Sequence, residues 1–486
     1  MSSKESILGG VLKYSVSTWL NMIIGFLSVI ITTRLIQPDV YGSIYLFISA
    51  SNVLMYVMSV GMDASLIRFY NDPPKDNSIN QVIYKSIIVT TLLSVLLGII
   101  GSCLFGDYVS TKVFSICSKL LVGYLFIYAY SLAIFRYLNI AYRMSFRVKQ
   151  YTIQNIVLNS LSRLLMIFAA LFTDGFIYII CLITLGTFAF LILYLFVQKK
   201  DITPIDIEGR INYSISLKNY RVFFRYALLG LPISFVADLN TYLTQQIIHT
   251  NLTAYSLGIF ASSGIFSHIL YGIKGGFSTF WSAFVFKNYK KEHERIKIMH
   301  NYIVLFSIIL VSIIVVFRDI IYLFIGKEFH DSKQFFSLLL ILPILYFVLE
   351  STDKGIYLAK KNEIALINFC VLVVTNIALC ILFIPKYGLV GAAYSSAFSA
   401  IVLYGLNTYM GQKYYKSMTS VKKSVVGTLF VLLILWYPSM TLNIYYIIFF
   451  TIVVDTIAVC VFRKEINSVY GYAISYIQKI RNGNDI

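Results

Sequence analysis

Charged residues are scarce in this sequence. They make up 13% of its 486 residues, whereas an ordinary soluble domain carries about 25%. Acidic residues are the rarer sign, with 22 Asp and Glu against 40 Lys and Arg. This shortage excludes a soluble globular enzyme and a disordered chain, because both expose far more charge to water.

Motifs for nucleotides and metals are also missing. The sequence contains no Walker lysine loop and no dinucleotide glycine fingerprint, and its six cysteines lack metal-ligand spacing. The segments between apolar runs are too short for an ATPase or a nucleotide-sugar domain. We therefore expect no catalytic residue, no metal site, no cofactor and no ATP hydrolysis within this chain.

Apolar residues fill most of the chain, at 58% of the sequence with a mean hydropathy of +0.77. Because a membrane-crossing helix needs about 20 apolar residues, the apolar runs predict an all-α polytopic membrane protein with about fourteen spans. The predicted spans are residues 11–33, 41–64, 82–104, 114–137, 151–172, 175–197, 223–246, 254–277, 300–317, 333–350, 364–384, 389–409, 424–441 and 443–462.

Positive charge follows the topology that these spans imply. If the N-terminus is cytoplasmic, the large majority of the 40 Lys and Arg fall in segments on the inner side. Basic residues concentrate on that side of membrane proteins, so we predict that both termini are cytoplasmic. Losing one span would reverse every later loop and destroy the bias.

The longest polar interruption, from about Gln198 to Asn219, divides the chain into two halves. Each half holds six predicted spans, so both enter the membrane in the same orientation and are expected to be related by a pseudo-two-fold along the membrane normal. The predicted parts are an N-terminal lobe (1–200), a cytoplasmic linker (201–222), a C-terminal lobe (223–412), two extra helices (413–464) and an amphipathic tail on the inner membrane surface (465–486).

One polar stripe crosses the middle of a predicted span. Asn155, Asn159 and Arg163 follow an i, i+4, i+8 pattern within residues 151–172. A charge in mid-membrane is costly and usually faces a cavity or a partner. Our interpretation is the wall of a wet cavity with a cation for an anionic substrate. The alternative is a structural arginine that pairs with a carboxylate such as Asp238.

Three other spans carry candidate charges: Asp238 in 223–246, Lys274 in 254–277 and Lys13 in 11–33. Asp238 is a candidate to bind a coupling H⁺ or Na⁺, or else it forms a salt bridge to Arg163 or Lys274. The two lysines extend the cationic set, although Lys274 lies near the inner end of its span and could simply reach the interface. The simplest geometry places these charges around one central cavity that suits a pyrophosphate.

Three stretches resemble a known family. They are IPKYGLVGAA at 384–393, TDKGIYLAKK at 352–361, and GMDA at 61–64 with RFY at 68–70. All three are similar to segments of the Wzx-type polysaccharide-export flippases. These flippases belong to the multidrug/oligosaccharidyl-lipid/polysaccharide (MOP) exporter superfamily, and together with the fourteen-span plan the resemblance covers nearly the whole chain.

The resemblance implies a flippase of the bacterial cytoplasmic membrane. Its substrate would be an undecaprenyl-pyrophosphate-linked oligosaccharide repeat unit, moved outward by alternating access for O-antigen, capsule or exopolysaccharide synthesis. A polysaccharide polymerase and a chain-length regulator would be partners. Within that function we expect Arg163 to contact the head group, Lys13 and Lys274 to capture it, Asn155 and Asn159 to contact sugar or water, and Asp238 to couple an ion.

This chain departs from the family pattern in one respect. Relatives use cavity cations on the first, second, seventh or eighth span, whereas Arg163 lies on the fifth. Two rival functions stay open. A MATE-like ion-coupled multidrug exporter would need an acidic cavity, and a membrane glycan polymerase or ligase would form glycosidic bonds.

Overall fold

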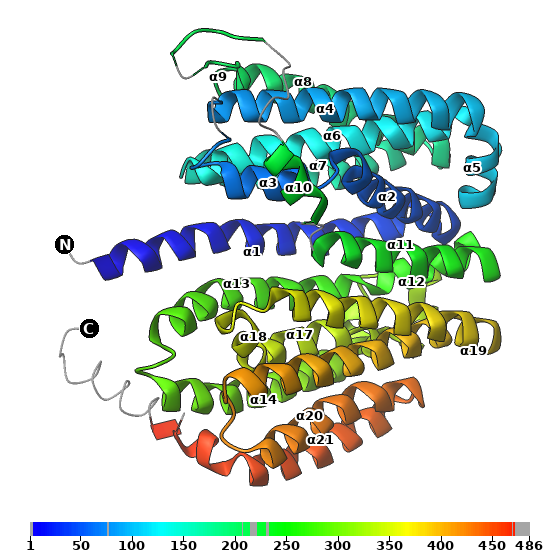
Figure 1. Ribbon diagram of the computed structural model, residues 1–486. Helices are drawn as coiled ribbons and strands as arrows, with labels where there is room; N and C mark the ends of the chain where they lie inside the picture. Colours follow the sequence, from blue (N-terminus) through cyan, green and yellow to red (C-terminus); the bar gives the residue numbers. More distant parts are fainter. Residues whose placement is uncertain are drawn as a thin grey trace, which may run out of the picture. The chain divides into compact units, whose positions relative to one another are not determined.

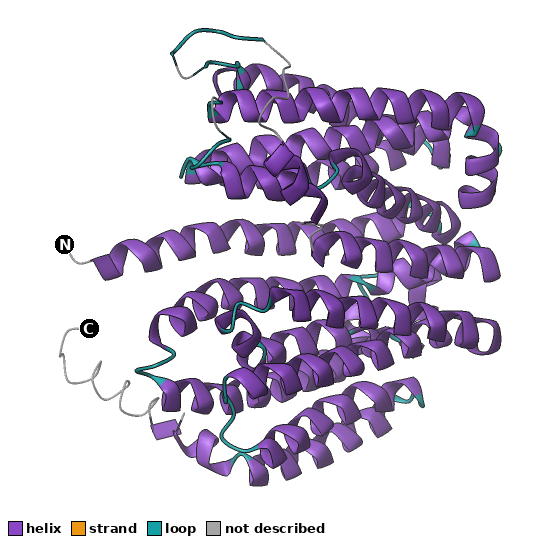
Figure 2. Ribbon diagram, viewed as in Figure 1, coloured by secondary structure: helices purple, strands orange, loops and turns teal. Residues whose placement is uncertain are grey.

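The computed structural model describes residues 3–74, 77–206, 208–213, 221–229, 233–468 and 470–471. For residues 3–18, 221, 222, 228, 229, 233, 265, 268 and 279 it describes the backbone alone. Within these ranges the regular structure is helical, apart from one isolated bridge between Ile205 and Ile211 (Figure 2). The predicted all-α fold is therefore confirmed.

Nine helices in the described part of the chain are long and apolar enough to cross a membrane, and one bent pair of helices would make ten. The chain is thus a multi-pass membrane protein. Each predicted span overlaps a helix of the structure, but the count of about fourteen and the symmetry of the two lobes stay predictions.

Contacts divide the chain into two compact units: unit 1 holds residues 1–265, 325–329 and 380–385, and unit 2 holds 266–324, 330–379 and 386–486. The lobe boundaries predicted from the length of the polar segment concern membrane topology, and they stay a proposal. The helices of unit 1 are α1 (Ser3–Leu35), α2 (Pro38–Ser59), α3 (Met62–Phe69), α4 (Ile79–Ile99), the π-helix η1 (Ile100–Leu104), α5 (Gly106–Phe114), α6 (Lys119–Met144), α7 (Val148–Ala170), α8 (Phe176–Val197), α9 (Lys199–Ile202), α10 (Arg221–Leu229), α11 (Ile233–Asn251) and α12 (Ala254–Ser263).

The remaining elements belong wholly or mostly to unit 2. They are α13 (Ile265–Asn288), α14 (His293–Val316), α15 (Arg318–Tyr322), η2 (Lys327–Gln334), α16 (Phe336–Leu339), α17 (Ile341–Thr352), α18 (Lys354–Leu358), α19 (Asn362–Tyr414), α20 (Val421–Trp436), η3 (Tyr437–Ser439) and α21 (Ile444–Val461).

Helix α6 is the centre of unit 1, where it contacts α2, α4, α7 and α8 (Figure 1). Its inward face carries Ile134 and Leu138, which join a buried apolar cluster with Leu66, Val82 and Phe223. Helix α1 lies along α7, and α2 lies along both α11 and α12. These contacts fix which faces of α1, α7 and α11 meet within the unit.

Helices α2 and α12 approach so closely that only glycine fits at their contact. A Cβ atom on Gly258 would lie 1.8 Å from the carbonyl oxygen of Pro38, and one on Gly42 would lie 2.2 Å from that of Ala254. Both obstructing atoms belong to the backbone, so a side chain at either position would force the helices apart.

Helix α14 is the corresponding centre of unit 2, where it contacts α17, α20 and α21. The buried His300 ring bonds Ser351 of α17 and Ser424 of α20, each at 2.8 Å. Because both ring nitrogens have partners, this histidine fastens three helices together.

The 53-residue helix α19 is two helices joined at Gly388, which has φ 57° and ψ −136°. Positive φ is easily adopted only by glycine, and Pro385 precedes the bend. The break therefore separates the predicted spans 364–384 and 389–409. The predicted amphipathic tail, 465–486, lies outside the described residues except for 465–468 and 470–471.

Candidate functional site

The predicted polar stripe lies on α7, the helix that packs along α1. The Asn159 side-chain amide donates a 2.8 Å hydrogen bond to the Asn155 carbonyl, and the Asn155 amide donates to the Tyr151 hydroxyl at 3.2 Å. From α1, the Asn21 amide donates to the Asn155 side-chain oxygen at 3.4 Å. The structure therefore connects the predicted stripe on α7 to a polar side chain of α1.

Arg163 lies on the same helix, with its guanidinium against α1. A Cβ atom on Gly25 would lie 3.0 Å from Nη1 of Arg163, so glycine at this position leaves room for the cation. The positive charge of Arg163 interacts electrostatically with the buried hydroxyls of Tyr41 and Tyr128. Among the residues that the structure describes, the guanidinium forms neither an ion pair nor a hydrogen bond.

The two interpretations of Arg163 make different demands on its surroundings. The structural alternative needs a carboxylate beside the guanidinium, and within the described side chains Asp238 interacts with a different arginine. A cation without a counter-ion in a spanning helix is expensive, so such residues are retained where they bind something. The geometry favours a binding cation.

Asp238 belongs to a second cluster in unit 1. Arg136 of α6 pairs through Nε with the Asp63 carboxylate at 2.8 Å, and its Nη1 donates to the Tyr56 hydroxyl at 3.0 Å. Tyr56 and Arg136 also interact with Asp238 of α11. The Arg136 guanidinium is therefore paired with Asp63 and acts on Asp238 at longer range. Oδ1 of the buried Asp63 has no hydrogen-bond partner in the described part of the chain.

Our sequence analysis missed Asp63 and Arg136 as site residues. Asp63 lies in the GMDA stretch that carries the family resemblance. Its place in that stretch is the signal in the sequence that could have indicated a functional role. Arg136 had been counted among the inner loop residues, because the predicted span ended at residue 137. In the structure α6 continues to Met144, which places Arg136 about two turns inside the helix.

Lys274 forms an ion pair with Glu350 at 3.1 Å in unit 2. The other oxygen of Glu350 binds Lys354 at 2.7 Å, so the local pair expected from the i, i+4 spacing of these two residues is present. Lys13 lies in α1, and its side chain is outside the described part.

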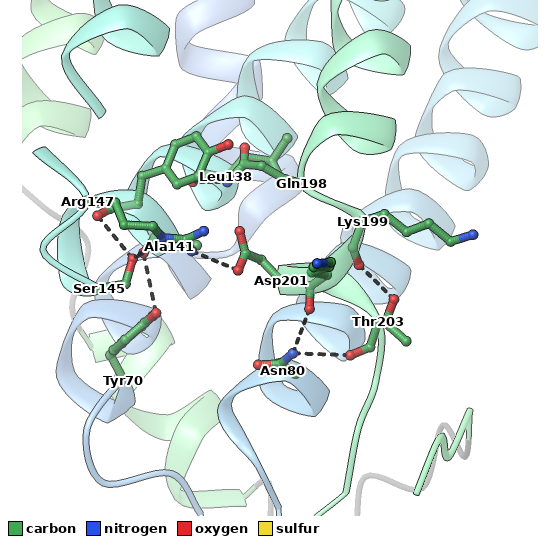
Figure 3. Close-up of polar contacts among 12 residues, drawn as sticks. Tyr70, Asn80, Leu138, Ala141, Ser145, Arg147, Gln198, Lys199, Asp201 and Thr203 are labelled. Carbon is green, nitrogen blue, oxygen red and sulfur yellow. Dashed lines mark hydrogen bonds and ion pairs between the residues drawn. The ribbon is translucent and has the colours of Figure 1, made fainter. Parts of the chain in front are cut away.

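A third polar cluster surrounds the turn between α6 and α7 (Figure 3). Arg147 binds Asp201 of α9 at 2.7 Å and donates to the Ser145 hydroxyl at 2.8 Å. The hydrogen bond with Asp201 raises the pKa of Arg147. Tyr70 and Asn80 bond backbone carbonyls in the same region. Since Arg147, Tyr70 and Asn80 have partners there, this cluster fastens the start of the predicted linker to unit 1 and is structural.

The described residues contain no group of three or more His, Cys, Asp or Glu that could hold a metal ion. The site chemistry available is that of guanidinium, ammonium, carboxylate and amide groups. These groups bind anions, hydroxyls and small cations.

Comparison with known proteins gives this chain a family and a fold. A protein-family model described as "Polysaccharide biosynthesis protein" matches residues 7–273. No curated protein sequence matches the chain at a significant level. Similar solved structures include a lipid II flippase, MurJ, in an inward closed conformation, with a TM-score of 0.69 and 16% identity over 93% of this chain and 99% of that one.

Two multidrug transporters are also similar. An inward-facing MATE transporter of the MOP superfamily has a TM-score of 0.53 and 16% identity, covering 82% of this chain and 94% of its own. The MATE multidrug transporter DinF-BH has a TM-score of 0.58 and 15% identity, covering 85% of this chain and 97% of its own. At these identities the likeness shows the fold, which is that of the MOP exporters.

Proposed function

Because the chain belongs to the polysaccharide biosynthesis protein family, we propose that it is a flippase for a lipid-linked oligosaccharide. The proposed substrate is an undecaprenyl-pyrophosphate-linked repeat unit, moved outward across the bacterial cytoplasmic membrane by alternating access. The product feeds O-antigen, capsule or exopolysaccharide synthesis, with a polymerase and a chain-length regulator as partners. Both termini are proposed to be cytoplasmic, with lobes at 1–200 and 223–412.

The uncompensated cation on α7 is the observation that carries this proposal. A guanidinium that no described carboxylate neutralises is available to an anionic head group, and its donors suit phosphate oxygens in a bidentate geometry. Asn159 and Asn155 lie about one and two turns before Arg163, where amides suit sugar hydroxyls or water. Lys13 and Lys274 are proposed as capture charges.

Asp238 is proposed as the group that couples an ion to transport. Its carboxylate and that of Asp63 both interact with the single guanidinium of Arg136, so the cluster has room for one more positive charge. A proton or a sodium ion on Asp238 would neutralise its carboxylate, so that Arg136 would then interact with the charge of Asp63 alone. Loss or gain of that ion therefore changes contacts between α6 and α11, which a transport cycle can use.

The MATE-like alternative is supported by the same two carboxylates, because an acidic pair suits a cationic drug. The two functions predict opposite charge requirements. A flippase requires Arg163 and exports no cationic dye, whereas a drug exporter requires Asp63 and Asp238 for dye efflux and is indifferent to Arg163. A polymerase or ligase is distinguished by glycosidic bond formation with the purified protein.

Translocation in proteoliposomes tests the proposal. We expect the purified chain to move an undecaprenyl-pyrophosphate-linked oligosaccharide between leaflets, and Arg163→Ala to abolish this movement while the protein still inserts. Arg147→Ala, outside the predicted spans, is the matched control and should retain transport. Normal transport by Arg163→Ala would remove Arg163 from the mechanism, and no transport by the wild-type chain would refute the function.

A further inference from the structure

Four charged side chains meet where α13, α17 and α18 come together in unit 2. We name Lys274, Glu350, Asp353 and Lys354 the Glu350 cluster. Glu350 lies at its centre, with Oε1 at 3.1 Å from the Lys274 ammonium and Oε2 at 2.7 Å from that of Lys354. The indole N–H of Trp281 donates to the Glu350 carbonyl at 2.8 Å, which fixes the backbone that carries this carboxylate.

The two lysines of the Glu350 cluster are held unequally. Lys354 is in contact with both carboxylates, since Asp353 lies 3.5 Å from its ammonium, and its side chain is only 8% exposed. Lys274 forms its described ion pair with Glu350, while Asp353 acts on it at longer range, and its side chain is 32% exposed. Lys354 is therefore a fixed member of the cluster, and Lys274 is the member that solvent and solutes can reach.

This inequality makes the Lys274 contact exchangeable. Breaking a buried ion pair is normally costly because it leaves a charge without a partner. Here Glu350 would keep the Lys354 ammonium at 2.7 Å after Lys274 left, so it would lose one of two cations and not its last one. Lys354 would then be the ammonium that Glu350 and Asp353 have in common. The ring of Tyr346, whose centroid lies 5.9 Å from the Lys274 ammonium, offers the lysine a second favourable surface during such a movement.

We propose that Glu350 is an internal competitor that occupies Lys274 until a phosphate-bearing anion takes the lysine from it. Lys354 acts as a positioning residue, because it keeps Glu350 neutralised while Lys274 is engaged elsewhere. The inference rests on the proposed function, in which Lys274 captures a pyrophosphate head group. It adds a specificity device to that function.

The competition selects ligands by charge. A single carboxylate in a ligand offers Lys274 no more than Glu350 already does, so the exchange gains little. A diphosphate carries more than one negative charge and several strong acceptor oxygens, so its attraction for an ammonium exceeds that of one carboxylate. The Glu350 cluster therefore favours diphosphates over monocarboxylates, which Lys274 alone would not do.

Binding of inorganic pyrophosphate to the full chain in lipid nanodiscs tests the competition, with undecaprenyl pyrophosphate as a second ligand to separate a free phosphate from a lipid head group. Glu350→Gln removes the competitor and should tighten binding about tenfold, which corresponds to roughly 1.4 kcal/mol. Asp353→Asn is the matched control, because it removes one charge from the same cluster and leaves the ion pair between Lys274 and Glu350 in place. It should change affinity less than threefold.

The double variant Glu350→Gln/Lys274→Gln completes the cycle. It should bind pyrophosphate as weakly as Lys274→Gln alone, since the competitor matters only while the lysine is present. Equal effects of Glu350→Gln and Asp353→Asn would overturn the proposal in favour of general electrostatics. Weaker binding by Glu350→Gln would also overturn it.

Amine labelling of the wild-type chain keeps the proposal testable if Glu350→Gln does not fold. Pyrophosphate should slow reductive methylation of Lys274 several-fold and leave that of Lys354 unchanged, as followed by mass spectrometry. No protection of Lys274 refutes the exchange. Translocation of the lipid-linked oligosaccharide, measured separately, distinguishes the failures: transport without protection refutes this inference alone, and no binding together with no transport refutes the proposed function as well.

Discussion

Replacing Arg163 with methionine should stabilise the folded protein while abolishing transport. The substitution keeps a long side chain against α1 but makes it apolar. It thereby removes a charge for which the described structure offers no counter-ion. An arginine at the centre of a spanning helix costs about 2.5–3.5 kcal/mol on insertion scales. The neighbouring amides and the partial exposure of Arg163 relieve part of this cost, so we expect a gain of about 1–3 kcal/mol.

Thermal unfolding of the purified protein in one detergent measures this gain, with Arg147→Met as the matched control. Both substitutions remove one guanidinium from unit 1. Arg147 has Asp201 at 2.7 Å and Ser145 at 2.8 Å, so its loss leaves the carboxylate without its cation. Arg163→Met should therefore raise the unfolding temperature and Arg147→Met should lower it, and the opposite signs are the test.

Two results would refute the reasoning. If Arg163→Met lowers the unfolding temperature as Arg147→Met does, the guanidinium holds the fold together and is not a free binding group. If it raises the unfolding temperature but translocation of the lipid-linked oligosaccharide continues, Arg163 lacks a counter-ion but is not needed for transport. Stability gained together with activity lost is the pattern expected of a functional residue that the fold pays for.

Three further outcomes follow from the contacts. Asn159→Asp places a carboxylate one turn before the free guanidinium, so it should raise the unfolding temperature and stop translocation by neutralising the cation. Gly258→Ala should destabilise unit 1 by about 1–3 kcal/mol, whereas Gly123→Ala, with nothing within 4 Å of the added carbon, should leave unfolding unchanged. Burial opposes ionisation of Glu465, but its hydrogen bonds from Lys423 and Asn301 outweigh burial and lower its pKa. Glu465→Gln should therefore cost about 1 kcal/mol at neutral pH, and the difference from wild type should vanish as pH falls from 4.5 through the lowered pKa.

Local features of the molecule were predictable from the sequence. Helical periodicity placed Asn155, Asn159 and Arg163 on one face, and the structure lays that face along α1. The same spacing joins Glu350 to Lys354 in the ion pair that the structure contains. Both features follow because residues four positions apart on a helix must lie close together.

Partners distant in the sequence were not predictable. For Asp238 the sequence offered Arg163 and Lys274 as alternative partners to a coupling ion, and it gave no sign of Arg136, with which Asp238 interacts in the described structure. Lys274 finds its carboxylate 76 residues further along the chain, in Glu350. Nothing in a single sequence states which helices of a bundle are neighbours, so a charge can be located in a span long before its counter-ion can be named.

The pairing of the cations separates structural charges from binding charges within unit 1. Arg136 serves two carboxylates and Arg147 serves one, so removing either residue strands an acid inside the fold. Arg163 could be deleted without stranding any described carboxylate. A charge that the fold does not use and whose burial costs free energy persists only if something outside the fold uses it. For a cation on a spanning helix, that argues for an anion that enters and leaves.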